Sequence, residues 1–373
     1  MSANSIQRLY ELGQSAWLDF ISHELLTSGA FRQLIQRDGL RGVTSNPTIF
    51  QKAIAGSTDY DALIDTAPAS ETDPAIFERI MVRDLQLACD ELLPVYEHTA
   101  GADGFASIEV SPMLAHETEG SVEQAQRLWT AVGRPNLMVK IPATREGLPA
   151  IEQCLVEGIN INVTLLFGVP RYLEVAKAYL RALETRVAQK RPVDRIASVA
   201  SFFVSRVDTK VDKIFDLLAP AAATERGKTL RGKIAIANAK IAYAEFERMA
   251  SSERWQQLAA QGARPQRLLW GSTSSKDPAY PDTYYVEALA GPRTVDTMPM
   301  DTFRAYLDHG APEIRITRDR ELAFEQIAEL ANLGIDFDSV VQTLEDEGVM
   351  SFVESYDQAI RSIAGKRRKL RSA

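Results

Sequence analysis

Histidine and cysteine are scarce in this chain of 373 residues. The two cysteines, Cys89 and Cys154, lie in apolar, helix-like segments, and we expect both to be buried and reduced. The histidines show no pairing at the spacing that metal ligands require; they are His23, His98, His116 and His309. The sequence therefore predicts no metal site and no disulfide framework.

Long apolar runs and excess positive charge are also missing. No stretch reaches the roughly 18 consecutive apolar residues of a membrane-spanning helix. The N-terminus has no basic segment followed by an apolar core, as a secretory signal would have. The formal net charge of −8 disfavours nucleic acid and membrane surfaces as partners. We expect a cytoplasmic protein without either kind of partner.

A Gly-rich G-x-G-x-x-G loop, which a doubly wound nucleotide-binding sheet often carries after its first strand, is absent as well. No cofactor is therefore predicted. Short strand-like segments instead alternate with helix-like segments along the whole chain. The strands are predicted over residues 16–20, 42–47, 104–112, 136–144, 159–167, 196–204, 267–273 and 293–298. This order predicts an α/β fold, a single (β/α)₈ TIM barrel domain covering residues 1–373.

Two helical predictions concern regions outside the strands. Residues 73–98 repeat apolar side chains mostly every three or four positions, which predicts a long helix. The segment from Ser121 reads as a capping box that opens a helix ending near Val132. Residues 321–363 are predicted to form a C-terminal helical extension that packs on the barrel and covers its mouth. The basic cluster at residues 366–371 is expected to be a frayed, solvated tail.

One lysine stands inside an apolar strand. With a period of two, Met138, Lys140 and Pro142 point to one side of the strand, and the residues between them point to the other. Lys140 lies near the carboxyl end of that strand, where parallel α/β folds bind ligands. The ordinary alternative is a lysine at a strand end whose ammonium group reaches water.

Other predicted strands carry polar residues at comparable places. Burying these groups without partners would cost on the order of 1–3 kcal/mol each, so a ligand site is a reasonable explanation. Single residues have ordinary alternatives: Asn46 could set a turn, Asp19 could cap a helix, and Thr164 could bond a neighbouring strand. The polar residues are Asp19, Thr44, Ser45, Asn46, Glu109, Ser111, Asn160, Asn162 and Thr164.

A lysine beside two carboxylates suits Schiff-base chemistry on a carbonyl substrate. Free lysine is almost entirely protonated at neutral pH, so the site must favour the neutral amine. Apolar neighbours such as Met138, Phe202 and Phe203 would favour it, whereas the carboxylates would favour the ammonium ion. The sequence leaves that balance open.

Five segments in this order resemble the transaldolase family, most closely its longer bacterial members, and the resemblance extends over the whole chain. The segments are Gly42–Phe50, Ser107–Pro112, Val139–Thr144, Ile161–Phe167 and Ser201–Asp208. By this resemblance Lys140 forms the Schiff base, and Glu109 assists through a water that Thr164 helps to hold. Asp19 would exchange the proton of the C4 hydroxyl group.

The resemblance also implies the substrate-binding residues. Asn46, Asn162 and Ser201 fall where the family binds the dihydroxyacetone unit, and Arg206 falls where it binds phosphate. Ser45, next to Asn46, is also expected to bind substrate. The chain departs from better-known members after the seventh strand, where Lys276 replaces a phosphate-binding arginine. Lys276 could supply the charge but not a bidentate contact, or it could pair with Asp277 or solvent.

The function implied is transaldolase activity in the pentose phosphate pathway. A dihydroxyacetone unit would move from sedoheptulose 7-phosphate to glyceraldehyde 3-phosphate, giving erythrose 4-phosphate and fructose 6-phosphate. One alternative is a class I aldolase of the fructose 6-phosphate type, which would release dihydroxyacetone. Another is a binding or scaffold protein that keeps the pocket without turnover. The expected partners are small phosphorylated sugars, with the protein a monomer or homodimer.

Overall fold

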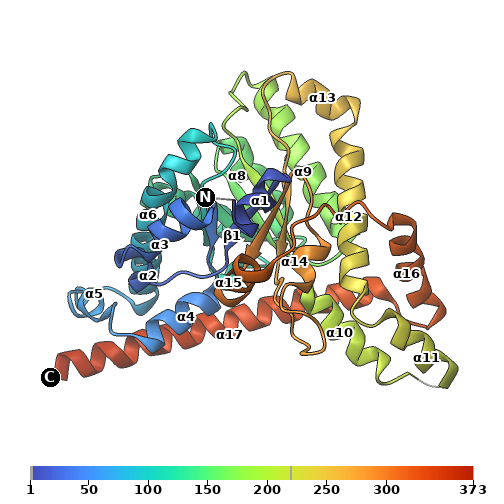
Figure 1. Cartoon of the computed structure of the whole chain (residues 1–373). Helices are drawn as coiled ribbons and strands as arrows, with labels where there is room; N and C mark the ends of the chain where they lie inside the picture. The colour runs from blue at the N-terminus through green and yellow to red at the C-terminus, as the bar shows by residue number, and fades with distance from the viewer. Residues whose placement is uncertain (1–2, 219–220, 373) are drawn as a thin grey trace.

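The computed structural model describes residues 3–218 and 221–372 (Figure 1). Its strands form a closed parallel barrel in which each strand pairs with the next and β8 pairs with β1. The predicted TIM barrel is confirmed. The strands are β1 (Gln14–Leu18), β2 (Gly42–Thr44), β3 (Phe105–Glu109), β4 (Leu137–Pro142), β5 (Ile161–Leu166), β6 (Ser198–Phe203), β7 (Arg267–Gly271) and β8 (Thr294–Met298).

Helices surround the barrel. The first half of the chain has α1 (Ser5–Glu11), α2 (His23–Thr27), α3 (Ala30–Gln33), the π-helix η1 (Leu34–Asp38), α4 (Pro47–Gly56), α5 (Asp61–Asp65), α6 (Asp73–His98), the 3₁₀ helix η2 (Pro112–Leu114), α7 (Thr118–Val132), α8 (Gly147–Glu157) and α9 (Val169–Ala188). The second half has α10 (Ser205–Phe215), α11 (Ala221–Leu230), α12 (Ile234–Ala250), α13 (Glu253–Ala259), α14 (Tyr284–Ala288), α15 (Met300–His309), α16 (Arg320–Asn332) and α17 (Phe337–Ser372).

The start of α7 was predicted incorrectly. The helix begins at Thr118, and its N-cap residue Glu117 makes no side-chain capping bond. Ser121 lies inside the helix, where its hydroxyl group donates to the carbonyl oxygen of Leu114 at 2.9 Å. The predicted capping box therefore does not form, because a tertiary contact uses the serine hydroxyl. The prediction of α6 over residues 73–98 is confirmed.

The strand register sorts side chains between the barrel interior and the helix layer. Glu109, Lys140 and Asn162 are direct neighbours on β3, β4 and β5, so they share the inner face. Below them the interior is filled by a separate apolar cluster that includes Trp17, Phe105, Met138, Val199, Leu269 and Val295. This cluster makes the lower interior a solid core, and only the carboxyl end of the strands is left for polar chemistry.

The amino-terminal end of the barrel is held by a buried carboxylate. Asp103 accepts hydrogen bonds from the Ser15 hydroxyl group and from the Trp17 indole nitrogen, the latter at 2.8 Å. Arg267 donates to the Ser15 hydroxyl oxygen at 2.9 Å. These contacts satisfy the buried carboxylate of Asp103, so this group needs no ligand.

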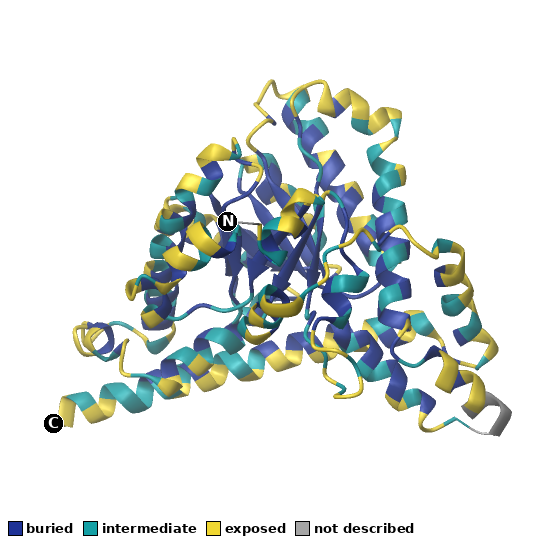
Figure 2. Cartoon of the chain, in the orientation of Figure 1, coloured by how far each residue is buried: buried dark blue, intermediate teal, exposed yellow. Residues whose placement is uncertain are grey.

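The long helix α17 runs across the opposite end of the barrel, from beside α10 to beside α4 and α5 (Figure 1). One face of α17 is buried and the other is exposed (Figure 2). Gly348 lets α17 approach β5 closely, since a Cβ atom there would lie 2.9 Å from Leu165. Leu165 itself has φ of 53° and lies at a register shift in β5. α17 therefore lies close to the carboxyl ends of the strands.

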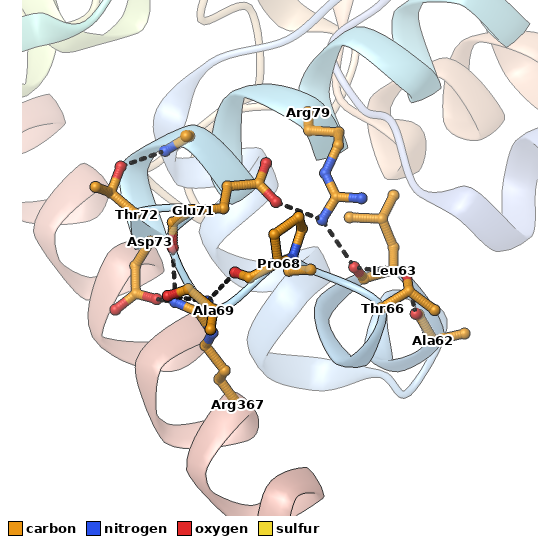
Figure 3. Close-up of polar contacts among 12 residues, drawn as sticks. Ala62, Leu63, Thr66, Pro68, Ala69, Glu71, Thr72, Asp73, Arg79 and Arg367 are labelled. Carbon is orange, nitrogen blue, oxygen red and sulfur yellow. Dashed lines mark hydrogen bonds and ion pairs between the residues drawn. The ribbon is translucent and has the colours of Figure 1, made fainter.

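The end of α17 corrects the prediction of a frayed tail. Lys366 donates to Asp61 at 2.5 Å and to the carbonyl oxygen of Ser57. Arg367 bridges to the segment between α5 and α6, donating to Asp73 at 3.1 Å and to the carbonyl oxygen of Pro68 at 2.6 Å (Figure 3). This end of α17 is anchored because acceptors from distant segments, which the local sequence does not reveal, bind the charged groups of Lys366 and Arg367.

Replacing Arg367 by alanine is expected to lower the free energy of unfolding by about 1–2 kcal/mol, because the Arg367 side chain donates to a carboxylate and to carbonyl oxygens. The expected fall in melting temperature is about 1–3 °C in a thermal scan, because the unfolding entropy of a chain of 373 residues is large. Arg368→Ala removes an exposed cation on the same helix and is the control. Equal losses in both variants would contradict the anchoring role of Arg367.

Within the described residues, no helix is both long enough and apolar enough to cross a membrane. Over the same residues, no group of three or more histidine, cysteine, aspartate or glutamate side chains is arranged to hold a metal ion.

Candidate active site

Lys140 lies inside the barrel, with 5% of its side chain exposed. Its Nζ atom is 3.1 Å from Oε2 of Glu109 and donates to the backbone carbonyl oxygen of Ser45 at 3.1 Å. The β3–β4 register brings the carboxylate and the amine together, because Glu109 and Lys140 are direct strand partners. A buried amine beside a carboxyl group is suited to attack on a carbonyl with proton transfer close by.

Asp19 follows β1 and lies in the same cleft as Lys140. Its Oδ1 atom accepts a hydrogen bond from the Thr44 hydroxyl group at 2.7 Å, and Thr44 in turn lies 2.7 Å from the hydroxyl oxygen of Thr297. Asp19 is not a helix N-cap, since Ser22 caps α2. This arrangement orients one carboxylate oxygen and leaves the other free of a hydrogen bond from a described side chain.

Burial raises the pKa of both carboxyl groups above the usual range. For Asp19, the charge of Lys140 and the hydrogen bond from Thr44 act in the opposite direction and lower the pKa. For Glu109, Lys140 likewise lowers the pKa, while the charge of Asp19 raises it. Carboxyl groups with raised pKa values can exchange protons near neutral pH, as general acid–base chemistry needs.

The Thr44→Val variant tests this electrostatic description of Asp19. The Thr44 bond stabilises the carboxylate, so its loss should raise the pKa of Asp19 further. If Asp19 acts as a base, it works only when ionised, so the acid limb of the rate–pH profile should move to higher pH. The Thr297→Val variant leaves the direct bond to Asp19 in place and is the control. An unmoved acid limb in Thr44→Val would contradict this role.

A second polar layer connects β3, β5 and β6. The Asn162 amide group donates to the Ser107 hydroxyl oxygen at 3.1 Å, and Ser201 donates to the Asn162 carbonyl oxygen at 2.6 Å. Ser201 lines the cleft, whereas Asn162 is fully buried behind it. The Thr164 hydroxyl group is also fully buried and has no hydrogen-bond partner among the described residues. An unpartnered buried hydroxyl at this place is available to a water molecule or a substrate.

Three polar residues that the sequence placed at the site serve other purposes. Asn160 donates to the carbonyl oxygen of Leu137 and accepts from the backbone of Ala197, so it fastens the start of β5. The Ser111 hydroxyl group caps the short helix η2. The Ser45 hydroxyl group donates to a backbone carbonyl oxygen of β3, and only the Ser45 carbonyl oxygen contacts Lys140.

Asn46 has two roles. Its Oδ1 atom accepts from the backbone of Ile49 and caps α4, as the alternative reading of a turn residue expected. Asn46 also lines the cleft, with its amide donors directed to no described acceptor. β2 ends at Thr44, and the capping residue Asn46 follows it, as expected for a predicted strand and its turn over residues 42–47.

The expectation for Phe202 is corrected, because Phe202 packs outside the barrel against Trp270 and cannot shield Lys140.

The cleft has a volume of about 1180 Å³ and opens at the carboxyl ends of the strands. Arg206 and Lys276 line it near Phe203, over whose ring the Arg206 guanidinium lies at 5.3 Å. Lys276 donates to the Ser274 hydroxyl oxygen at 2.6 Å and forms no ion pair with Asp277 in the described structure. The cleft can therefore receive an extended anionic substrate that reaches Lys140.

The residues lining this cleft that the sequence prediction missed include Lys52, Thr297 and Phe352. Thr297 stands at the carboxyl end of β8, so the rule applied to the other strands would have found it. Lys52 and Phe352 lie on helices, and no strand-based pattern identifies them.

Comparison with known proteins agrees with this geometry. The family model of transaldolase/fructose-6-phosphate aldolase matches residues 16–363. The chain belongs to this family. A transaldolase of Trichodesmium erythraeum is 45% identical over 99% of both chains. A transaldolase of Thermobifida fusca is 48% identical, covering 96% of this chain and 97% of the relative. Transaldolase family membership therefore spans both the barrel and most of the C-terminal helix.

Proposed function

We propose that this protein is a transaldolase that carries a dihydroxyacetone unit on Lys140. The activity is supported by the full-length similarity to curated transaldolases. The observation that carries the role of Lys140 is its position inside the barrel, 3.1 Å from Glu109 and at the base of a large cleft. The reaction is that of the pentose phosphate pathway, between sedoheptulose 7-phosphate and glyceraldehyde 3-phosphate.

Lys140 attacks the C2 carbonyl carbon of the donor, and water leaves as the imine forms. Glu109 supplies and removes protons in this step, because its carboxyl group lies beside the amine and its pKa is raised by burial. Thr164 helps to hold the water through which Glu109 acts. Its unpartnered, buried hydroxyl group supports that role.

Asp19 acts on the donor once it is bound as the imine. The carboxylate takes the proton of the C4 hydroxyl group, the C3–C4 bond breaks, and its electron pair moves to the imine nitrogen. The aldehyde product leaves and the acceptor aldehyde adds at C3, with Asp19 returning the proton. Hydrolysis of the new imine releases the ketose and restores the Lys140 amine.

Asn46 and Ser201, which line the cleft, bind the three-carbon unit in this proposal, and Asn162 accepts a hydrogen bond from Ser201 and holds it in place. Ser45 contributes through its backbone, whose carbonyl oxygen orients the Lys140 amine. At the outer part of the cleft, Arg206 and Lys276 bind the substrate phosphate.

Trapping the imine with borohydride tests the proposal. The enzyme is mixed with fructose 6-phosphate and borohydride, and the product is examined by intact mass and peptide mapping. We expect a stable three-carbon adduct on Lys140. Binding of fructose 6-phosphate without any adduct would contradict the assignment and favour a binding protein. Release of free dihydroxyacetone as the main product, without transfer to an acceptor, would favour the aldolase alternative.

Three expectations from the sequence stay predictions. They are a single domain over residues 1–373, a cytoplasmic location, and a monomeric or homodimeric state. Small phosphorylated sugars are the substrates that the proposal requires.

A further inference from the structure

The cleft contains three cations without an ion-pair partner in the described structure: Lys52, Arg206 and Lys276. Among the described residues, Arg206 contacts the Phe203 ring and makes no hydrogen bond, and Lys276 donates to Ser274 alone. Buried or half-buried guanidinium groups are normally paired, so an unpaired Arg206 points to an anionic ligand.

Four acidic residues line the same cleft, Asp19, Asp277, Asp282 and Asp301, and the first three have contacts elsewhere. Asp282 pairs with His309 at 2.9 Å, and Asp277 accepts from the backbone nitrogen of Ala279 at 2.9 Å. Asp19 is held by Thr44 beside the reacting amine. In the described structure none of these carboxylates forms an ion pair with Lys52, Arg206 or Lys276, although the charge of Asp19 is near enough to favour the charged forms of Arg206 and Lys276.

The cations are near enough to affect one another. Burial lowers the pKa of Lys276, and the charges of Arg206 and Lys52 lower it further, against the opposing effect of Asp19. Mutual repulsion of this kind is relieved when an anion binds between the charges.

The fold places Lys52 on a different wall of the cleft from the other two cations. Lys52 shares one face of α4 with Thr48 and Ile49, at helical spacings of four and three residues, and all three line the cleft. Thr48 is fixed by a 2.8 Å hydrogen bond to Ser355 of α17. α4 follows β2, whereas Arg206 follows β6, the strand on the opposite side of the barrel.

We propose that Lys52 is a third phosphate-binding residue, which closes over the substrate phosphate from the wall opposite Arg206 and Lys276. This inference rests on the proposed function, since it presupposes phosphorylated sugars as substrates. Lys276 offers a point charge and not the bidentate fork of an arginine. A second lysine on the facing wall provides the charge and the hydrogen-bond donors that such a site lacks.

Steady-state kinetics of the Lys52→Met variant tests the proposal. In a ping-pong reaction, kcat/KM for the acceptor reports the acceptor step alone. For erythrose 4-phosphate we expect kcat/KM to fall about tenfold, and for unphosphorylated erythrose we expect less than a twofold change. Inorganic phosphate should inhibit the variant with an inhibition constant about tenfold higher than that of the unchanged enzyme.

Two further variants serve as controls. Lys52→Arg keeps the charge and should keep most of the activity with erythrose 4-phosphate. Lys177→Met removes an exposed positive charge on α9, outside the cleft, and should leave kcat/KM unchanged for both acceptors. A Lys52→Met variant with unchanged kinetics for erythrose 4-phosphate would overturn the inference. Equal losses with both acceptors would overturn it too, because they would indicate a structural role.

Failure of this inference differs from failure of the proposed function. Borohydride trapping on Lys140 is performed on Lys52→Met in parallel. If Lys52→Met is trapped as the adduct and its kcat/KM for erythrose 4-phosphate is unchanged, only the role of Lys52 is rejected. Absence of the adduct in the unchanged enzyme rejects the transaldolase mechanism itself.

Discussion

Replacing Lys140 by alanine should lower the rate of dihydroxyacetone transfer by at least about 10⁴-fold and abolish the borohydride adduct. The amine is the nucleophile of the proposed mechanism. The neighbouring Thr164 hydroxyl and Glu109 carboxyl groups cannot replace it with a stable imine. The measurement is the coupled transfer rate with fructose 6-phosphate and erythrose 4-phosphate, together with intact mass after reduction.

The Lys140→Ala variant should still fold. Lys140 holds down the pKa of Glu109, so without the lysine that carboxyl group is expected to take up a proton and to remain uncharged in the barrel. Circular dichroism and a thermal scan check this point. Transfer at the original rate by a folded Lys140→Ala protein would refute the Schiff-base assignment.

Replacing Asp19 by asparagine should lower the transfer rate by about 10²–10⁴-fold while leaving imine formation possible. Asparagine keeps the size of the side chain and a contact with Thr44, but it cannot accept the proton of the C4 hydroxyl group. The variant thereby separates imine formation on Lys140 from cleavage of the C3–C4 bond. Reduction with borohydride should trap the uncleaved six-carbon phosphate donor on Lys140, where the unchanged enzyme retains the three-carbon fragment.

Intact mass distinguishes these adducts directly. A three-carbon adduct formed by Asp19→Asn at the original rate would show that another group takes the proton. The Asp277→Asn variant, which changes a carboxylate of the same cleft that is bonded to a backbone nitrogen, is the matched control and should retain the three-carbon adduct.

The order of eight strand-then-helix segments was sufficient to predict the barrel, and the alternation of side chains along the fourth strand predicted the orientation of Lys140. Each parallel strand must present one face to the interior and one to the helices, so a period of two identifies the face without any tertiary information. Glu109, Lys140 and Asn162 could be placed together for this reason, and the register confirms it.

Periodicity does not identify the end of the barrel at which a polar residue lies or the partner that it finds. Asn160 and Asn162 alternate in the same pattern, yet Asn160 bonds to backbone groups at the start of β5 and Asn162 joins the polar layer next to Lys140. The same limit applies to Ser45, whose hydroxyl group bonds to β3 and leaves only its carbonyl oxygen for Lys140.

The sequence by itself therefore determined the barrel, the inward lysine and the two carboxyl groups near it, because local periodicity and strand ends encode them. Only the tertiary structure decided the parts that depend on distant segments. It brought the Lys52 face of α4 to the cleft, and it anchored Arg367 to Pro68 in the loop before α6 and to Asp73 at the start of α6. Such contacts join residues far apart in the chain, and a charged side chain carries no local signal of which distant partner will bind it.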